Sequence, residues 1–202
     1  MTFLPIVETQ QGDVTGYIPT NLISMTDGQI YLSSELFQEG FKPAVDLGLS
    51  VSRIGNKIQN PLMRNLCGMM RLEYIQYKEL LNVTKLRAIV SKEAQQKLKI
   101  GHVLSEVLIQ DKNEPVDAPE EMLLFYAFRK GYLESLPPKL IREFKNHFFD
   151  YFLERRPDLV KHIESGIKNF SAPEAEWDKV MTEYLTVCGT ESLSEAKETG
   201  GR

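Results

Sequence analysis

Hydrophobic and polar residues follow two different periods along this chain. Between Pro43 and Arg53 large apolar residues alternate with small or polar ones, and the apolar positions are Val45, Leu47, Leu49 and Val51. A period of two predicts a β-strand with one face in a core. From Asn60 onward apolar residues recur every three or four positions, as they do in amphipathic helices. The pattern therefore predicts a strand-and-turn region followed by a helical region.

The first region, residues 1–59, contains only short predicted elements. Apolar runs predict a buried strand at 4–7 and a second strand at 29–32, with a turn at 27–28 before the second strand. Capping serines predict a short helix at 33–40, which a glycine closes. So few strands cannot bury a core of their own. We therefore expect an α/β remnant that forms the edge of a larger sheet.

The second region, residues 60–188, is predicted to be an all-α bundle. A long helix opening at Pro61 carries a stripe of Leu66, Met70, Tyr74, Tyr77 and Leu81. The next helix starts at Ser91 and is predicted to be interrupted near Gly101. A third begins at Asp117, and its continuous apolar run at 122–128 indicates burial nearly all round.

Two further apolar stripes complete the predicted bundle. They are formed by Leu140, Ile141, Phe144, Phe148, Tyr151 and Phe152, and by Trp177, Met181 and Tyr184. A capping box at 171–174 is expected to open the last helix. Residues 189–202 are rich in Gly, Ser, Thr and Glu and predict a disordered tail. The chain as a whole should be predominantly helical.

Composition removes several function classes. The formal net charge of −4 gives no basic surplus of the kind that nucleic-acid-binding proteins carry. Two cysteines (Cys67, Cys188) and three histidines (His102, His147, His162) have no metal-ligand, CxxC or triad spacing, so no metal site is predicted. The apolar run at 122–128 is far shorter than the roughly 20 residues that span a bilayer. Membrane association is therefore expected only through partners.

Three stretches carry a family resemblance: Leu4-Pro-Ile-Val-Glu-Thr-Gln10, Tyr17 to Leu32, and Pro43-Ala-Val-Asp-Leu-Gly-Leu-Ser-Val-Ser-Arg53. Together they closely resemble the α subunit of F-type ATP synthases, in the last third of its nucleotide-binding domain. Catalytic β subunits and the vacuolar and flagellar-export ATPases share the Pro-Ala-Val-Asp element and the terminal Ser-Arg. The stretch Thr26-Asp-Gly-Gln29 favours the α subunit over them. The resemblance implies the edge of a P-loop NTPase sheet followed by a helical bundle.

The resemblance also implies a role for Arg53. In the family the matching arginine reaches across a subunit interface into the catalytic site of the β subunit and approaches the terminal phosphate. A planar, permanently charged fork suits that task, because phosphoryl transfer spreads negative charge over several oxygens. Spacing alone also fits an ordinary surface arginine at a strand end. Ser24 matches a family serine near the same pocket, although a serine near a helix end is equally ordinary.

A second nucleotide contact follows from the resemblance. Gln110 matches a glutamine that contacts the adenine of a non-hydrolysed nucleotide, and Pro43 is retained. Lys42 replaces the usual arginine and Lys112 replaces a second glutamine, and both departures count against an intact adenine contact. No GxxxxGK[ST] loop occurs in the sequence, and no carboxylate can be assigned to magnesium. The resemblance therefore implies ATP or ADP with Mg²⁺ bound by an assembled complex.

The implied function is that of part of the regulatory, non-catalytic α subunit of a proton-driven ATP synthase. The implied partners are β subunits, the γ subunit of the central stalk, and the remaining part of the α subunit if the chain is split. Met1-Thr2 aligns inside the family sequence, so we expect a carboxyl-terminal portion that is split, processed or incomplete.

Such a chain is expected to lie peripherally on an energy-transducing membrane. Divergence at Asn82-Val-Thr-Lys-Leu86 favours the mitochondrial inner membrane over the bacterial plasma membrane. The alternative function is a non-enzymatic scaffold in which the strand region is vestigial.

Overall fold

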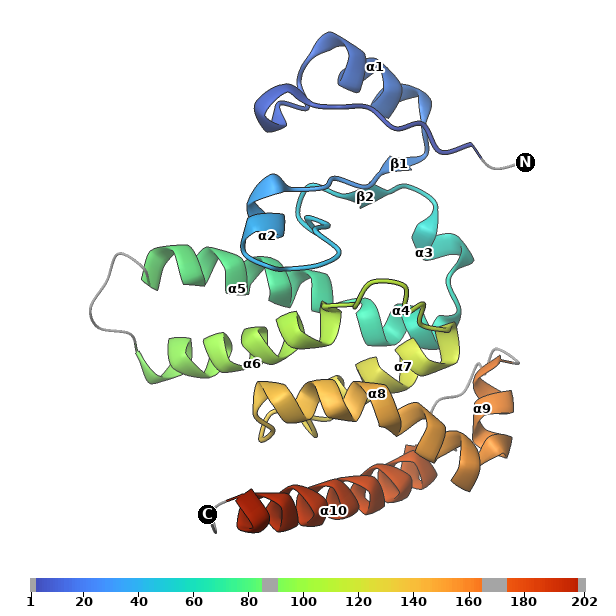
Figure 1. The fold of residues 1–202 in the computed structure, drawn as a ribbon. Coiled ribbons are helices and arrows are strands. Elements are labelled where there is room, and N and C mark those ends of the chain that lie inside the picture. The colour runs from blue at the N-terminus through green and yellow to red at the C-terminus, as the bar shows by residue number, and fades with distance from the viewer. Residues whose placement is uncertain (1–2, 85–90, 165–173, 200–202) are drawn as a thin grey trace.

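The computed structural model describes residues 3–84, 91–164 and 174–199, and in it two regions are stacked (Figure 1). The first region holds short elements: η1 (Gln10–Gly12), α1 (Tyr17–Met25), β1 (Gly28–Gln29), α2 (Ser34–Gln38), β2 (Val51–Ser52) and α3 (Gly55–Ile58). The second holds α4 (Pro61–Cys67), α5 (Met70–Thr84), α6 (Lys92–Leu108), α7 (Ala118–Arg129), α8 (Pro138–Arg155), α9 (Pro157–Glu164) and α10 (Glu174–Thr199). The predicted order of an α/β remnant and a helical bundle is confirmed.

The core lies in the helical region. Within the described residues, Pro19 and Leu36 are the only buried side chains before Leu62, whereas every helix from α4 to α10 contributes buried apolar residues. All seven residues of the predicted apolar run at 122–128 are buried in α7. The stripes predicted for α8 and α10 also face this core: Ile141, Phe144, Phe148, Phe152, Trp177, Met181 and Tyr184 are buried.

The long helix predicted from Pro61 is divided into two. Gly68 follows α4 and Met69 precedes α5, and glycine is about 1 kcal/mol less favourable than alanine inside a helix. The predicted stripe nevertheless stays on the buried side, since Leu66, Met70, Tyr74 and Tyr77 are all buried.

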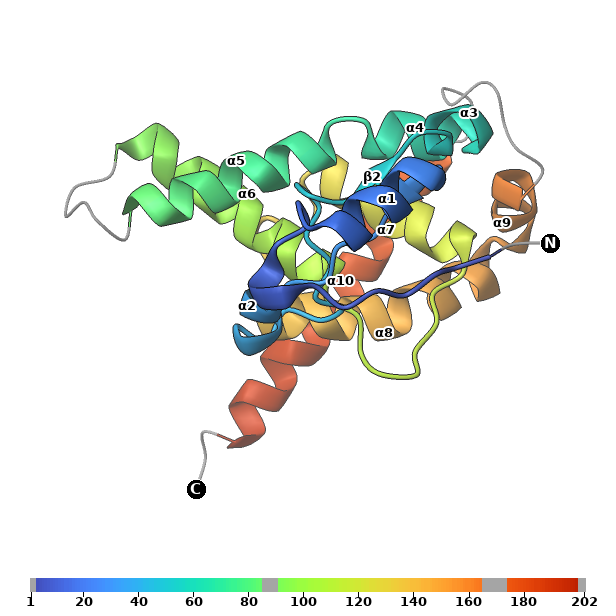
Figure 2. The same cartoon turned by 90° about the horizontal axis from the view of Figure 1, so that it is seen from above.

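The predicted interruption at Gly101 is wrong, because α6 runs through it without a break. Gly101 is buried, and a Cβ placed on it would lie 2.2 Å from the ring of Tyr77 on α5. The glycine therefore allows α5 and α6 to pack closely, rather than ending a helix. Figure 2 shows these two helices side by side, projecting together from the body of the molecule.

Three features of the last helices are not those that the sequence predicts, or lie outside the described residues. The sequence patterns do not indicate α9. The capping box at 171–174 begins in residues outside the described ranges. The backbone of α10 is helical to Thr199, where composition predicts a tail. Extending an existing helix needs no new nucleation, so a polar but helix-compatible stretch can continue it.

The long strand predicted over 43–53 is wrong. Only Val51–Ser52 forms a strand, antiparallel to β1 with Gln29 opposite Val51, and Val45 makes an isolated bridge to Leu32. Between them the chain turns at Asp46, whose Oδ1 accepts hydrogen bonds from the backbone N–H groups of Gly48 (2.7 Å) and Leu49 (3.0 Å). Such an Asx-turn competes with strand pairing.

The buried strand predicted at 4–7 is also absent. Leu4 is 80% exposed and Ile6 is 99% exposed. Apolar alternation or an apolar run becomes a buried strand only where neighbouring strands and a covering layer exist. Among the described residues the sheet ends with β1 and β2, so nothing covers this run.

Specific contacts join the two regions. The Nη2 of Arg71, on α5, donates to the carbonyls of Gly48 (3.2 Å) and Ser50 (3.0 Å). The backbone N–H of Gln110, just after α6, donates to the carbonyl of Lys42 at 2.8 Å. The first region is thus tied to the start of α5 and the end of α6. Nowhere in the described ranges does a helix have both the length and the apolar character needed to cross a membrane.

Candidate functional site

Arg53 lies immediately after β2, with its backbone fixed and its side chain exposed. Its N–H donates to the carbonyl of Asp27 at 2.9 Å, which continues the β1–β2 pairing by one residue. Its Nη2 donates to the carbonyl of Ile23, near the end of α1, over a long 3.4 Å. No carboxylate of the described residues pairs with it. The backbone of Arg53 is therefore well fixed, whereas its guanidinium is held by one long hydrogen bond.

The stretch Thr26-Asp-Gly-Gln29 lies beside the strand that leads into this arginine. The Thr26 hydroxyl lies 3.0 Å from the carbonyls of Leu22 and Gly28 and can donate to either, which joins the end of α1 to β1. A Cβ on Gly28 would lie 2.4 Å from the Val51 carbonyl, so β2 approaches β1 this closely only at glycine. In the sequence this stretch serves only to distinguish one family from its relatives. The structure shows that it also fixes the backbone that carries Arg53.

Ser24 lies on α1, one residue after the carbonyl that receives the Arg53 guanidinium. Its side chain is exposed, and its hydroxyl donates to the carbonyl of Thr20 at 2.8 Å, inside its own helix. The structure thus brings the two predicted catalytic residues to one corner of the first region. To donate to a phosphate oxygen, the Ser24 hydroxyl has to leave Thr20.

The predicted adenine contacts are brought together only in part. Lys42, Pro43 and Gln110 meet through the 2.8 Å backbone hydrogen bond from Gln110 to Lys42. The Nε2 of Gln110 donates to the Glu114 carbonyl at 2.6 Å, which leaves its side-chain oxygen for another donor. Lys112 is exposed in the loop beyond and does not take part in this junction.

Lys145 supports that loop from α8, and the sequence patterns do not reveal it. Its ammonium donates to the carbonyls of Glu106 (3.4 Å) and Ile109, so it satisfies the carboxyl-terminal end of α6. Burial lowers the pKa of Lys145. The position of this lysine within α8 gives no hint of its role, because the carbonyls that it caps belong to a different helix.

No cluster of His, Cys, Asp and Glu in the described ranges has the arrangement of a metal site. The predicted site residues Arg53, Ser24 and Gln110 carry a guanidinium, a hydroxyl and an amide, all of which act on charge or on hydrogen-bonding edges. Their chemistry is that of binding and electrostatic stabilisation.

An α/β edge ending in an exposed arginine, followed by a helical bundle, is the arrangement implied by the resemblance, and comparison with known proteins supports it. Residues 59–184 match the family described as ATP synthase alpha/beta chain, C terminal domain, and residues 1–52 match the ATP synthase alpha/beta family, nucleotide-binding domain. The chain belongs to the ATP synthase alpha/beta family.

Within that family the chain corresponds to the carboxyl-terminal portion of an alpha subunit. It is 39% identical over 188 residues to ATP synthase subunit alpha of Lawsonia intracellularis, covering 93% of this chain and 36% of that protein. It is 42% identical over 168 residues to ATP synthase subunit alpha of Aquifex aeolicus, covering 83% and 33%. The chain thus spans about a third of the length of these relatives. The predicted family is confirmed.

Proposed function

We propose that this chain works as the carboxyl-terminal part of a non-catalytic alpha subunit in a proton-driven ATP synthase, and that it supplies Arg53 to the nucleotide site of a neighbouring beta subunit. The observation that carries the proposal is the state of Arg53: its backbone is anchored to Asp27, while its guanidinium is exposed and unpaired by any described carboxylate. An exposed guanidinium without a counter-charge is available to a phosphate held by a neighbouring subunit.

In this proposal the neighbouring subunit holds the nucleotide and its Mg²⁺, and Arg53 adds positive charge to the phosphoryl oxygens in the transition state. Breaking one hydrogen bond of 3.4 Å costs little, so the guanidinium is free to turn toward that site. An arginine supplied in trans raises phosphoryl-transfer rates by about 10³–10⁵-fold in GTPases. Ser24 adds a hydroxyl donor beside it.

Lys42, Pro43 and Gln110 are proposed to contact the adenine of a second, non-hydrolysed nucleotide, with Lys112 at its edge. What supports this is their junction at the hydrogen bond between Gln110 and Lys42. The helical region is proposed to meet the gamma subunit of the central stalk, and the first region to join the rest of an alpha subunit. The complex as a whole would hold the chain peripherally on an energy-transducing membrane, mitochondrial or bacterial.

The test is Arg53→Ala in the assembled complex. We expect ATP synthesis and hydrolysis to fall by at least about 10³-fold, with subunit composition unchanged. Arg64→Ala, an exposed arginine on α4, is the matched control and should leave turnover unchanged. The chain purified without beta subunits should not hydrolyse ATP. Full turnover of the Arg53→Ala complex would contradict the proposal.

The alternative is a scaffold without a catalytic contribution. It is favoured by the distribution of the core, which lies almost entirely in the helical region. A scaffold predicts that Arg53→Ala and Arg64→Ala behave alike, and that changes in the bundle core alone disturb assembly. The same pair of variants therefore separates the two functions.

A further inference from the structure

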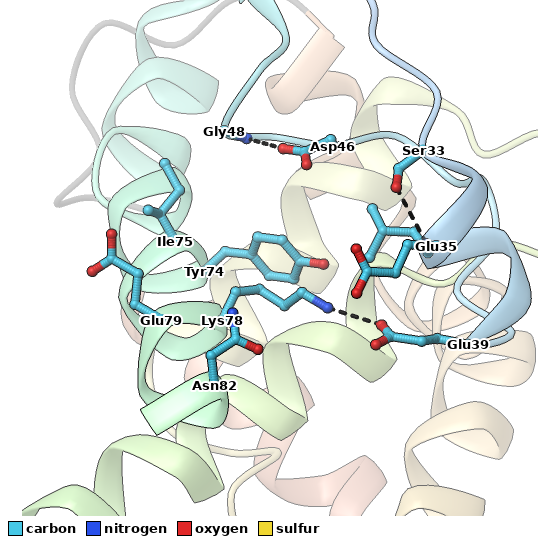
Figure 3. A pocket seen from close by; sticks show the side chains of 11 residues that line it. Ser33, Glu35, Glu39, Asp46, Gly48, Tyr74, Ile75, Lys78, Glu79 and Asn82 are labelled. Carbon is cyan, nitrogen blue, oxygen red and sulfur yellow. Dashed lines mark hydrogen bonds and ion pairs between the residues drawn. The ribbon is translucent and has the colours of Figure 1, made fainter. Parts of the chain in front are cut away.

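A pocket of about 240 Å³ opens between α2, the turn at 46–48 and α5 (Figure 3), and Arg53 does not line it. Its lining carries four carboxylates, from Glu35, Glu39, Asp46 and Glu79, and one ammonium, from Lys78. The formal charge of the lining is therefore −3. None of these residues has a part in the proposed phosphoryl chemistry.

Only one of the four carboxylates is neutralised within the described part of the chain. Lys78 Nζ lies 2.9 Å from Glu39 Oε2. Asp46 uses one oxygen for the two backbone N–H groups of its turn. Glu35 and Glu79 make no ion pair with any described residue. The pocket thus has a surplus of negative charge in a partly enclosed place, where charges are screened less than on an open surface.

Tyr74 gives an independent indication of a ligand. It is only 3% exposed, and its ring packs against Phe41 with 5.8 Å between centroids. In Figure 3 its hydroxyl points into the pocket, toward α2, and none of the hydrogen bonds among the described residues includes it. A hydroxyl that opens into the pocket from a side chain buried this far, without a partner among the described residues, is available to hydrogen-bond a ligand there.

The state of that hydroxyl defines what it can bind. Burial, with the charge of Asp46 adding to it, raises the pKa of Tyr74 to about 12, so the phenol stays neutral at physiological pH. A neutral hydroxyl can accept a hydrogen bond or donate one, and the negative charge of the lining favours a cationic N–H group as its partner. Leu36 and Ile75 supply apolar surface beside it, suited to a short carbon stem.

We propose that this pocket binds an organic cation with N–H donors, an alkylammonium or guanidinium group, with the Tyr74 hydroxyl as hydrogen-bond acceptor and Glu35 and Asp46 as counter-charges. The carboxylates come from α2 and its carboxyl-terminal cap, the turn at 46–48 and α5, around a space larger than one ion, and no described cluster has the arrangement of a metal site. The cation is either a free amine or the side chain of a neighbouring polypeptide.

The first experiment uses n-butylammonium as the probe, titrated calorimetrically into the full chain at constant ionic strength. Tetramethylammonium, which has the charge but no N–H, is the control ligand. We expect saturable binding of butylammonium that weakens about tenfold in Tyr74→Phe and in Glu35→Gln. The matched variants Tyr17→Phe and Glu143→Gln, both on exposed residues elsewhere, should bind as the unaltered chain does.

A second experiment, on the complex isolated with its partners, distinguishes the sources. Saturable binding retained in the complex identifies a free amine. Binding blocked in the complex, with subunit association at low salt weakened by Glu35→Gln and unaffected by Glu143→Gln, identifies a partner's side chain. The proposal is overturned if butylammonium binds saturably neither to the chain nor to the complex and Glu35→Gln leaves subunit association unchanged. It is also overturned if Tyr74→Phe and Glu35→Gln both bind butylammonium as the unaltered chain does.

Discussion

The two regions of this molecule divide stability and chemistry between them. The helical region from α4 to α10 buries aromatic residues in layers, as where Phe144 stacks on Phe148 with 4.5 Å between ring centroids. The first region has almost no interior, yet it carries Arg53 and Ser24. The comparison indicates that the bundle can hold its own shape, whereas the first region is shaped by contacts: hydrogen bonds within it, anchors on α5 and α6, and, in our proposal, partner subunits.

The largest loss of stability that would distinguish the two regions is expected from a substitution in the bundle core. Phe148→Ala removes a ring that is 1% exposed and should lower the free energy of unfolding by about 3–5 kcal/mol. Phe3→Ala removes one that is 80% exposed and should cost less than about 0.5 kcal/mol. Urea unfolding of both variants measures the contrast. Equal costs would mean that the first region has a core of its own.

A second change tests the close packing of α5 on α6. Gly101→Ala places a methyl group against the Tyr77 ring and should cost about 1–3 kcal/mol of unfolding free energy. In a Tyr77→Ala background the same change should cost much less, because the obstructing ring is gone. Thermal or urea unfolding of the unaltered chain, the two single variants and the double variant gives the coupling. An additive result would show that the two residues do not meet.

These two regions also differ in how well their sequence patterns predict structure. The stripe from Leu66 to Tyr77 predicts its buried face correctly, because the residues that cover it lie in the same chain. The alternation from Val45 to Val51 predicts a continuous strand, of which only Val51–Ser52 forms, because a longer strand requires pairing partners that the described residues do not offer. The prediction at Gly101 is wrong for a related reason: only the position of Tyr77 shows why a glycine is needed there.

Sequence patterns predict the candidate site only in part, as they do the fold of the first region. Arg53, Ser24 and Gln110 are identified through the family resemblance, and the structure brings the first two to one corner. The roles of Thr26 and Lys145 lie outside the reach of sequence patterns, because each depends on backbone carbonyls that only the fold brings near. Hydrogen bonds to the main chain leave little trace in residue spacing.

Thr26 gives a test within the first region. Thr26→Val removes the hydroxyl that joins α1 to β1 while keeping the side-chain shape. The backbone that carries Arg53 should then be held less rigidly. We expect turnover of the assembled complex to fall about tenfold, the equivalent of about 1.4 kcal/mol. Thr182→Val, which removes a similar bond within α10, is the control. Unchanged turnover in Thr26→Val would show that this hydroxyl does not position Arg53.

The smallest expected effect concerns the junction at the end of α6. Because burial lowers the pKa of Lys145, the native state releases this proton at lower pH than the unfolded chain, whose lysines titrate at about 10.4. The unfolded state therefore holds more protons in that window, and stability should rise with pH there. Relative to Lys145→Met, the unaltered chain should gain unfolding free energy as pH increases toward about 10.4. A flat difference between the two urea titrations would contradict this.

The grip of Arg71 on the carbonyls of Gly48 and Ser50 has a mechanical consequence. This side chain belongs to the first turn of α5, and the loop that it holds runs directly into β2 and Arg53. The Arg71 guanidinium thus couples α5 directly to the loop that precedes β2. Any tilt of α5 and α6 would therefore pull on the start of β2, and Arg53 directly follows the end of this two-residue strand.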